Sequence, residues 1–110
     1  KFEEKGFADG VGEIARFNQP CGIAISMDKS CLFIADCNNH CLRTLSLADS
    51  SVFTIAGKAD EAGYVDGLGQ EARFRNPSDV AVDSLHSVVV ADTSNHCIRK
   101  IDTQIVLFNN

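Results

Sequence analysis

The chain contains the same segment twice, and this repeat constrains the fold more than any other feature of the sequence. Residues 6–25 align with residues 63–82, and nine of those twenty positions are identical. After a one-residue shift, residues 35–45 align with residues 91–101, with six of eleven positions identical. A long period in which core and turn residues recur together is typical of proteins that stack one supersecondary unit. The sequence therefore predicts an array of two such units.

Each copy contains short apolar segments separated by turn residues, the pattern expected of β-strands. The predicted strands are residues 22–26, 31–35, 41–47 and 51–55 in the first copy, and 79–83, 87–91, 97–101 and 105–108 in the second. The second segment of each copy is continuously apolar, as in strands covered on both faces. Four antiparallel strands per unit suit a β-propeller blade. We expect an all-β fold made of two four-stranded antiparallel blades of an incomplete propeller.

A glycine-rich linker, Gly-x-x-Asp-Gly-x-Gly-x-x-Ala-Arg-Phe, precedes the first strand of each copy, at 6–17 and again at 63–74. We expect its acidic residue, Asp9 or Asp66, to cap a helical turn that carries the Ala-Arg-Phe segment. The linker faintly resembles a calcium loop, but it lacks the further alternating carboxylates that calcium sites need. We therefore interpret it as a turn scaffold.

The aromatic residue that ends each linker, Phe17 or Phe74, is expected to pack between neighbouring blades. The prolines that follow, Pro20 and Pro77, have a restricted φ and are expected to set the start of the innermost strand.

Asp36 and Asp92 follow the buried strand of each copy, where Asx chemistry favours a tight turn. Their candidate partners are Arg43 and Arg99 of the third strands, or Arg16 and Arg73 of the linkers. A recurring buried Asp–Arg contact would lock the turn, because polar groups removed from water need partners. A ligand-binding role for the same carboxylates is the alternative.

The pairs Asn39-His40 and Asn95-His96 invite a catalytic or metal-binding interpretation, because histidine is a common base and ligand. Both pairs stand at the same position of the repeat. Since active sites are rarely duplicated blade by blade, we predict the same structural role for both pairs.

Several of these segments resemble the NHL repeat family, whose repeats form β-propeller blades. The resemblance lies in residues 18–24, 32–36, 39–43 and 95–102. Thr-Ile-Ala-Gly at 54–57 is similar to the family's blade-ending motif, and the linker resembles the subset that combines thioredoxin with NHL repeats. The second copy departs from the pattern, because residues 104–110 have no Ala-Gly terminator. Such propellers commonly have about six blades, and protein–protein recognition is the family's commonest role.

This resemblance implies that the chain is a fragment of a longer propeller. We expect residues 1–5 to end a linker from a missing blade, 6–58 to form the first blade with its linker, and 59–110 the second. Ring closure removes open sheet edges, and two blades cannot close a ring. The expected partners are another protein or the remaining blades of the parent propeller, with self-association of the isolated piece.

The composition disfavours three other classes of function: nucleic-acid binding, membrane insertion, and metal or disulfide chemistry at the cysteines. The net charge of −5 and the scattered basic residues disfavour nucleic-acid binding. No apolar run approaches the ~20 residues of a membrane span. The five cysteines offer one close pair, Cys37 and Cys41, and half of it is missing from the second copy. We interpret the cysteines as small apolar fillers, and unpaired thiols fit a reducing compartment such as the cytoplasm.

The leading hypothesis is a non-catalytic interaction module without cofactor or metal, in which loop residues carry the function. One alternative is part of a propeller enzyme similar to amidating lyases or hydrolases, which would need inward His or Asp residues on several innermost strands. Only Asp79 and Asp83 meet that need, and only in the second copy. The other alternative is RNA binding, which the acidic balance disfavours.

Overall fold

The computed structural model describes residues 5–67 and 69–102, and this part of the chain is all-β. The strands are β1 (Gly10–Val11), β2 (Pro20–Ile25), β3 (Cys31–Asp36), β4 (Cys41–Ser46), β5 (Ser51–Gly57), β6 (Pro77–Val82), β7 (Ser87–Asp92) and β8 (Cys97–Asp102). Four single turns of 3-10 helix connect them: η1 (Gly12–Ile14), η2 (Cys37–Asn39), η3 (Gly69–Glu71) and η4 (Thr93–Asn95). None of the helical segments in the described residues is long and apolar enough to cross a membrane.

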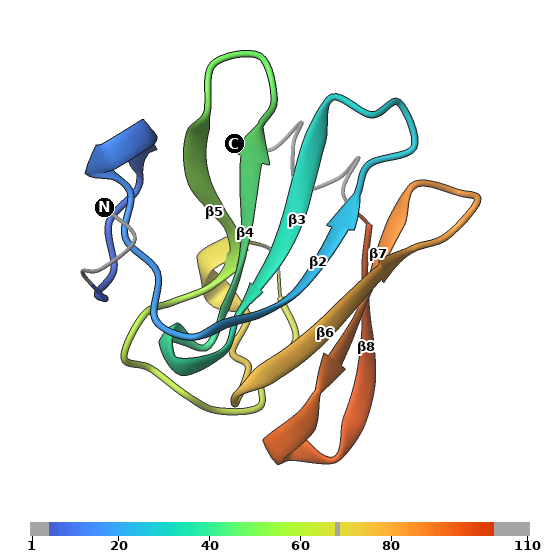
Figure 1. Ribbon diagram of the computed structural model, residues 1–110. Coiled ribbons are helices and arrows are strands. Elements are labelled where there is room, and N and C mark those ends of the chain that lie inside the picture. Colours follow the sequence, from blue (N-terminus) through green and yellow to red (C-terminus); the bar gives the residue numbers. More distant parts are fainter. Residues whose placement is uncertain (1–4, 68, 103–110) are drawn as a thin grey trace.

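The strands form two antiparallel sheets, one for each copy of the repeat (Figure 1). The first sheet has the order β1-β5-β4-β3-β2, and the second has the order β6-β7-β8. Consecutive strands pair as hairpins, so each sheet has the meandering topology expected of a propeller blade. We call β2–β5 the first blade and β6–β8 the second blade.

The strand count differs from the predicted four in both sheets. The first sheet gains β1, a two-residue part of the linker that pairs with β5 through Gly10 opposite Val52 and Val11 opposite Ser51. Two residues are too few for an alternating pattern, so this strand could not be predicted. The predicted fourth strand of the second copy, residues 105–108, lies outside the described residues.

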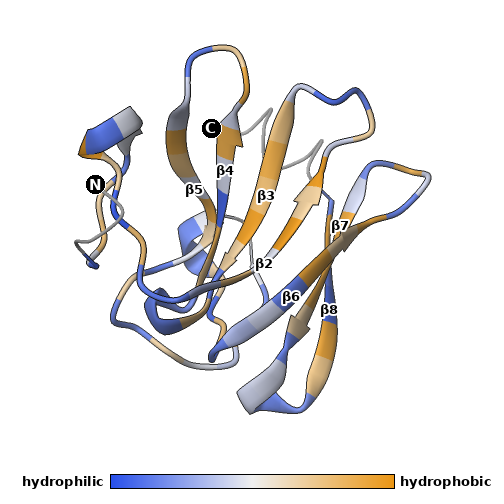
Figure 2. Ribbon diagram, in the orientation of Figure 1, coloured by the Kyte–Doolittle hydropathy of each residue, from blue (hydrophilic) through white to orange (hydrophobic). Residues whose placement is uncertain are grey.

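The core lies between the two blades, where the facing strands carry their apolar residues (Figure 2). The first blade contributes Phe33, Ala35, Leu42, Ile55 and Ala56, and the second contributes Val80, Val88 and Val90, with Ala72 and Phe74 of its linker. Phe74 is 1% exposed within this cluster. It therefore packs between the blades, as the sequence predicted for this residue.

The innermost strands β2 and β6 lie side by side at the seam between the blades (Figure 1). Their closest approach is at Gly22, where an added Cβ atom would lie 2.5 Å from the Cα atom of Asp79. Contact at this distance leaves no room for a side chain at position 22. Glycine is therefore required there by packing between repeats.

No sheet among residues 5–67 and 69–102 packs against the opposite face of the first blade. Phe17, Ile23, Leu32, Ile34 and Leu45 line a hollow of about 320 Å³ on this face, and Ile23 is 61% exposed. The aligned positions in the second copy pack against the first blade, and Phe74, Val80, Val88 and Val90 among them are buried. The same apolar face is therefore covered in one copy and uncovered in the other.

Candidate functional site

Arg43, on β4, is completely buried, and both terminal nitrogens of its guanidinium donate hydrogen bonds. Its Nη1 atom donates to Asp36 Oδ2 at 2.8 Å and to the carbonyl of Arg16 at 2.7 Å. Its Nη2 atom donates to Asp9 Oδ1 at 2.9 Å and to the carbonyl of Ala8 at 2.7 Å. One guanidinium thus ties the linker to the end of β3, where Asp36 stands. We call Arg43 and the groups that it binds the arginine node.

Two aromatic rings of the linker enclose the same guanidinium. The ring centroid of Phe7 lies 4.5 Å from Arg43 Cζ, and that of Phe17 lies 4.7 Å from it. A guanidinium between two rings is stabilised by cation–π attraction, and the rings also keep water away from its hydrogen bonds.

Asp36 is completely buried, and both of its carboxylate oxygens accept hydrogen bonds. Its Oδ2 atom also accepts a hydrogen bond from Asn39 Nδ2 at 2.7 Å, and its Oδ1 atom accepts one from the backbone N–H of Asn18 at 2.9 Å. Asn39 Nδ2 donates in addition to the carbonyl of Gly6 at 2.7 Å. The tight turn predicted after Asp36 is present as η2. The backbone N–H two residues on, at Asn38, donates to the carbonyl of Asn18 and not to the Asp36 carboxylate.

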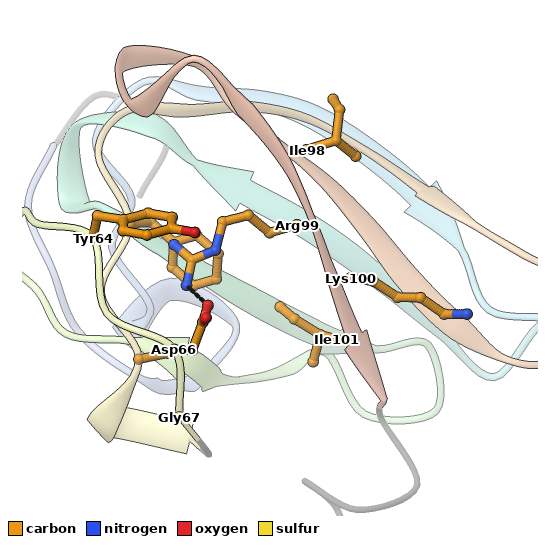
Figure 3. Close-up of a pocket in the computed structure, with 9 residues that line it drawn as sticks. Tyr64, Asp66, Gly67, Ile98, Arg99, Lys100 and Ile101 are labelled. Atoms are coloured by element: carbon orange, nitrogen blue, oxygen red, sulfur yellow. Dashed lines mark hydrogen bonds and ion pairs between the residues drawn. The ribbon is translucent and has the colours of Figure 1, made fainter.

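The second copy repeats the arginine node around Arg99, on β8. Nη1 of Arg99 donates to Asp92 Oδ2 at 2.9 Å and to the carbonyl of Arg73 at 2.7 Å. Nη2 donates to Asp66 Oδ1 at 2.9 Å (Figure 3) and to the carbonyl of Val65 at 2.8 Å. Burial opposes the charged form of Arg99, but hydrogen bonds and charge from Asp92 and Asp66 raise its pKa above the usual value.

The flanking groups of the second node also repeat. Tyr64 takes the place of Phe7, with its ring 4.7 Å from Arg99 Cζ, and Phe74 lies on the other side at 4.8 Å. Asn95 Nδ2 donates to Asp92 Oδ2 at 2.7 Å and to the carbonyl of Gly63 at 2.8 Å. The two nodes are therefore the same construction at the same place in each repeat.

Of the two candidate sets of arginines, the strand arginines bind Asp36 and Asp92. The linker arginines Arg16 and Arg73 enter the nodes through their backbone carbonyls. Their guanidiniums turn outward, where Arg73 Nη2 lies 3.2 Å from a carboxylate oxygen of Glu61.

The helix-capping role predicted for Asp9 is wrong. The helical turn of the first linker is η1, which begins three residues before the Ala-Arg-Phe segment, and Val11 holds its N-cap position without a side-chain bond. Asp9 points to Arg43 instead, as Asp66 points to Arg99. Attraction to the buried positive charge of Arg43 stabilises this position of Asp9 by more than the about 1 kcal/mol that a helix cap contributes.

His40 and His96 both close a 3-10 turn in the left-handed backbone conformation, with φ of 56° and 58°. Nδ1 of His40 also accepts the backbone N–H of Asn76 at 3.0 Å, across the seam between the blades. Burial, and then the positive charge of Arg75, lower the pKa of His40. His96 is exposed. The bond to Asn76 could not be predicted from the repeat, since it joins different positions of the two copies.

All five cysteines lie in the described residues and are free thiols. Only Cys41 is buried, and burial raises its pKa to about 12. The interpretation as buried fillers is therefore wrong for Cys21, which is exposed. Within residues 5–67 and 69–102, no three His, Cys, Asp or Glu side chains stand close enough to hold a metal ion.

The comparisons with known proteins agree with this geometry. The family model described as NHL repeat matches residues 74–101. NHL repeat-containing protein 2 of Bos taurus is 37% identical over 97 residues, which cover 80% of this chain and 13% of that protein. Protein SUPPRESSOR OF QUENCHING 1, chloroplastic, of Arabidopsis thaliana is 34% identical over 98 residues, which cover 86% of this chain and 9% of that protein.

Solved structures show the same fold. A protein of unknown function from Bacteroides thetaiotaomicron has a TM-score of 0.83 and 35% identity, over 89% of this chain and 24% of that one. A protein from the same organism, described as an auxiliary nutrient binding protein, has a TM-score of 0.78 and 33% identity, over 90% and 26%. The chain thus spans about a quarter of these structures and a smaller share of its relatives. With its two repeated blades and arginine nodes, the chain belongs to the NHL repeat family.

Proposed function

We propose that the chain is a non-catalytic protein–protein interaction module within a longer NHL-repeat propeller. In this proposal residues 6–58 and 59–110 form two successive blades, each with its leading linker, and residues 1–5 end the linker of a preceding blade. The open apolar face of the first blade supports a further blade on that side, because its counterpart in the second copy is covered by the first blade.

The observation that carries the proposal is that the polar residues singled out by the repeat hold the fold together. The carboxylates of Asp36 and Asp92 are fully buried and bound to arginine, and Asn39 and Asn95 bind both the carboxylate and a linker carbonyl. A catalytic carboxylate must reach a substrate. These two are enclosed on all sides, which favours a structural role for the node and leaves recognition to the loops.

The loops that precede β2 and β6 and the turns η2 and η4 lie at one end of the blades (Figure 1). Arg75 is exposed at this end, beside η4, where its carbonyl accepts the N–H of Ser94 at 3.1 Å. Loops held by a rigid scaffold are common binding surfaces. We therefore place the proposed recognition surface at this end.

The enzyme alternative has some support from a solved structure described as a putative phosphatase, from Bacteroides thetaiotaomicron, at 29% identity and a TM-score of 0.81. A nutrient-binding role is named for another similar structure. This chain covers only about a quarter of either, so neither activity extends to it directly. The net charge of −5 continues to disfavour RNA.

A photo-crosslinking amino acid at Arg75 tests the proposal, with the same amino acid at Ser84 as the matched control. Ser84 is also exposed but follows β6 at the opposite end of the blade. We expect Arg75 to give discrete protein adducts that resist nuclease and are competed by excess unmodified chain, and Ser84 to give few. Nuclease-sensitive adducts would favour RNA binding, and turnover of phosphate esters by the purified chain would favour an enzyme.

A further inference from the structure

Two cysteines of the first blade are brought together at the end where β2 begins and the turn η2 lies (Figure 1). Cys21 is the second residue of β2, and Cys37 is the first residue of η2. Pro20 lies opposite Asp36, and the register of β2 against β3 then shifts before Gly22. Cys21 is therefore the extra residue of a β-bulge, which re-aims its side chain, and Cys37 directly follows the end of the facing strand.

The two thiols are in contact. Burial raises the pKa of Cys37, and so do a hydrogen bond with Cys21 and the negative charge of the Cys21 thiolate. Contacts across the seam hold η2 in place, because Asn76 Nδ2 donates to the carbonyl of Cys37 at 3.5 Å and the backbone N–H of Asn76 donates to His40 Nδ1. The hydrogen bond requires the two sulfur atoms to be neighbours.

The second copy repeats this contact with hydroxyl groups in place of thiols. Cys21 aligns with Ser78, and β6 has the same bulge at this position. Cys37 aligns with Thr93, the first residue of η4. The hydroxyls of Ser78 and Thr93 share a direct hydrogen bond. The γ atoms at these two positions therefore meet in both copies, and such an approach is what a disulfide requires.

The two thiols can also be reached by a small solute. Cys21 is exposed and Cys37 is partly exposed, whereas Cys41 is buried and Cys31 packs against the core. Ser78, the counterpart of Cys21, stays partly exposed although the first blade covers the apolar face of its sheet. A further blade packed on the first blade in the same way would therefore leave Cys21 accessible.

We propose that Cys21 and Cys37 form a redox-modification site, a dithiol that hydrogen peroxide converts into a disulfide. The sulfur of Cys21 loses its proton and attacks one peroxide oxygen, which gives a sulfenic acid and releases one water. The sulfur of Cys37 then attacks the sulfur of Cys21, so that the S–S bond forms and a second water leaves. The two thiols lose two electrons and two protons, and the peroxide takes them up. This proposal rests on the placement of the thiols and does not depend on the proposed function.

Oxidation of the full 110-residue chain with a small excess of hydrogen peroxide tests the proposal. Remaining thiols are alkylated in denaturant, and the chain is then cleaved before its aspartates, which separates residues 9–27, 28–35 and 36–48. We expect residues 9–27 and 36–48 to be joined, the chain mass to fall by two hydrogen atoms, and dithiothreitol to reverse both changes. Fragmentation of the joined peptides should place the bond between Cys21 and Cys37.

Cys37→Ser is the matched variant, because its hydroxyl keeps the contact seen in the second copy but cannot close the bond. The sulfenic acid of Cys21 should then accumulate. Dimedone, a trap for sulfenic acids, should label Cys21 at least about tenfold more in this variant than in the unchanged chain, since the neighbouring thiol acts at a high effective concentration. Cys41→Ala should leave the bond between Cys21 and Cys37 unchanged.

A double substitution in the second copy tests the geometry independently. Ser78→Cys together with Thr93→Cys should yield a second disulfide under the same treatment, because the two γ atoms already meet there. Failure of either pair to close, a bond from Cys37 to Cys41, or a bond between two chains in dilute solution would overturn the proposal. Equal dimedone labelling of the Cys37→Ser variant and the unchanged chain would also overturn it. These outcomes are separate from protein binding by the loops beside Arg75.

Discussion

At the level of single residues, a charged side chain in the interior holds each linker to its blade. Arg43 is fully buried with two carboxylates, two carbonyls and two aromatic rings around it. An isolated ion in such a place costs several kcal/mol. The four hydrogen bonds donated by Nη1 and Nη2 of Arg43 offset this cost, while its Nε atom is buried without a hydrogen-bond partner among the described residues. Loss of Arg43 or of its buried partner Asp36 should therefore destabilise the node, which ties the linker to its blade.

Replacement of Arg43 by methionine should destabilise the chain by about 3–5 kcal/mol, because the buried Asp36 then loses its counter-charge. The free energy of unfolding from urea denaturation measures this. Arg99→Met is the matched variant and should cost a similar amount, because it leaves the equally buried Asp92 without its counter-charge. Equal losses below about 1 kcal/mol in both variants would contradict the role of the node.

His40 should make stability depend on pH. Its pKa is lowered in the folded chain from the ordinary 6.5, so between the two values the unfolded chain binds more protons. The contribution to stability is therefore complete above about pH 6.5 and is lost as the pH falls from this value through the lowered pKa of the folded chain. Urea midpoints between pH 7.5 and 5.5 should show the loss.

His40→Asn should flatten this pH dependence, because asparagine tolerates the left-handed conformation and does not titrate. His96→Asn is the matched control, since His96 has the same backbone conformation but is exposed. Equal pH dependence in the His40→Asn variant and the unchanged chain would contradict a role for the bond to Asn76.

At the scale of elements, the end of β5 depends on close contact with the start of β4. Gly57→Ala places a Cβ atom 2.6 Å from the carbonyl oxygen of His40, a backbone atom that cannot move aside. Gly12→Ala is the control, because Gly12 also has a positive φ, of 57°, but has no atom near enough to clash.

We expect Gly12→Ala to cost about 1 kcal/mol from its backbone conformation alone, and Gly57→Ala to cost about 1–3 kcal/mol more from the clash. Thermal unfolding followed by circular dichroism compares the two. The same cost for both variants would mean that β5 does not meet β4 in this register.

Some strands could be predicted from the sequence and others could not. Strands such as β3 and β7 were predictable because their apolar runs and flanking turn residues agree. β1 was not, since two linker residues carry no period and pair with β5 only after the chain has folded back. The capping role of Asp9 was mistaken for the same reason, because a local rule could not anticipate an arginine thirty-four residues away.

At the scale of the whole molecule, the repeat predicted stacking but not the contacts that differ between copies. Asp36 and Asp92 each had two possible arginine partners, since both arginines recur with the same period. Packing decided between them, because only the strand arginine lies inside the sheet. The bond between His40 and Asn76 joins unlike positions of the repeat, so no alignment of the copies could reveal it.

Phe74 and Phe17 form a matched pair for the contact between blades, because both stack on an arginine node but only Phe74, in the linker of the second blade, is covered by the first blade. Phe74→Ala should cost about 3–5 kcal/mol, the usual loss for a buried phenylalanine. Phe17→Ala should cost about half as much, since its ring is partly exposed. Urea denaturation measures both, and equal losses would place the core within each blade instead of between them.

The most direct test of the account is whether the innermost strands of the two repeats touch. NMR of the chain in solution should show a strong nuclear Overhauser effect between the Hα protons of Gly22 and Asp79, because an added Cβ atom at Gly22 would lie 2.5 Å from the Cα atom of Asp79. Detection of this signal, together with those inside each sheet, is the result that the account predicts. Signals inside each sheet without any between β2 and β6 would contradict it, since the repeats would then fold without stacking.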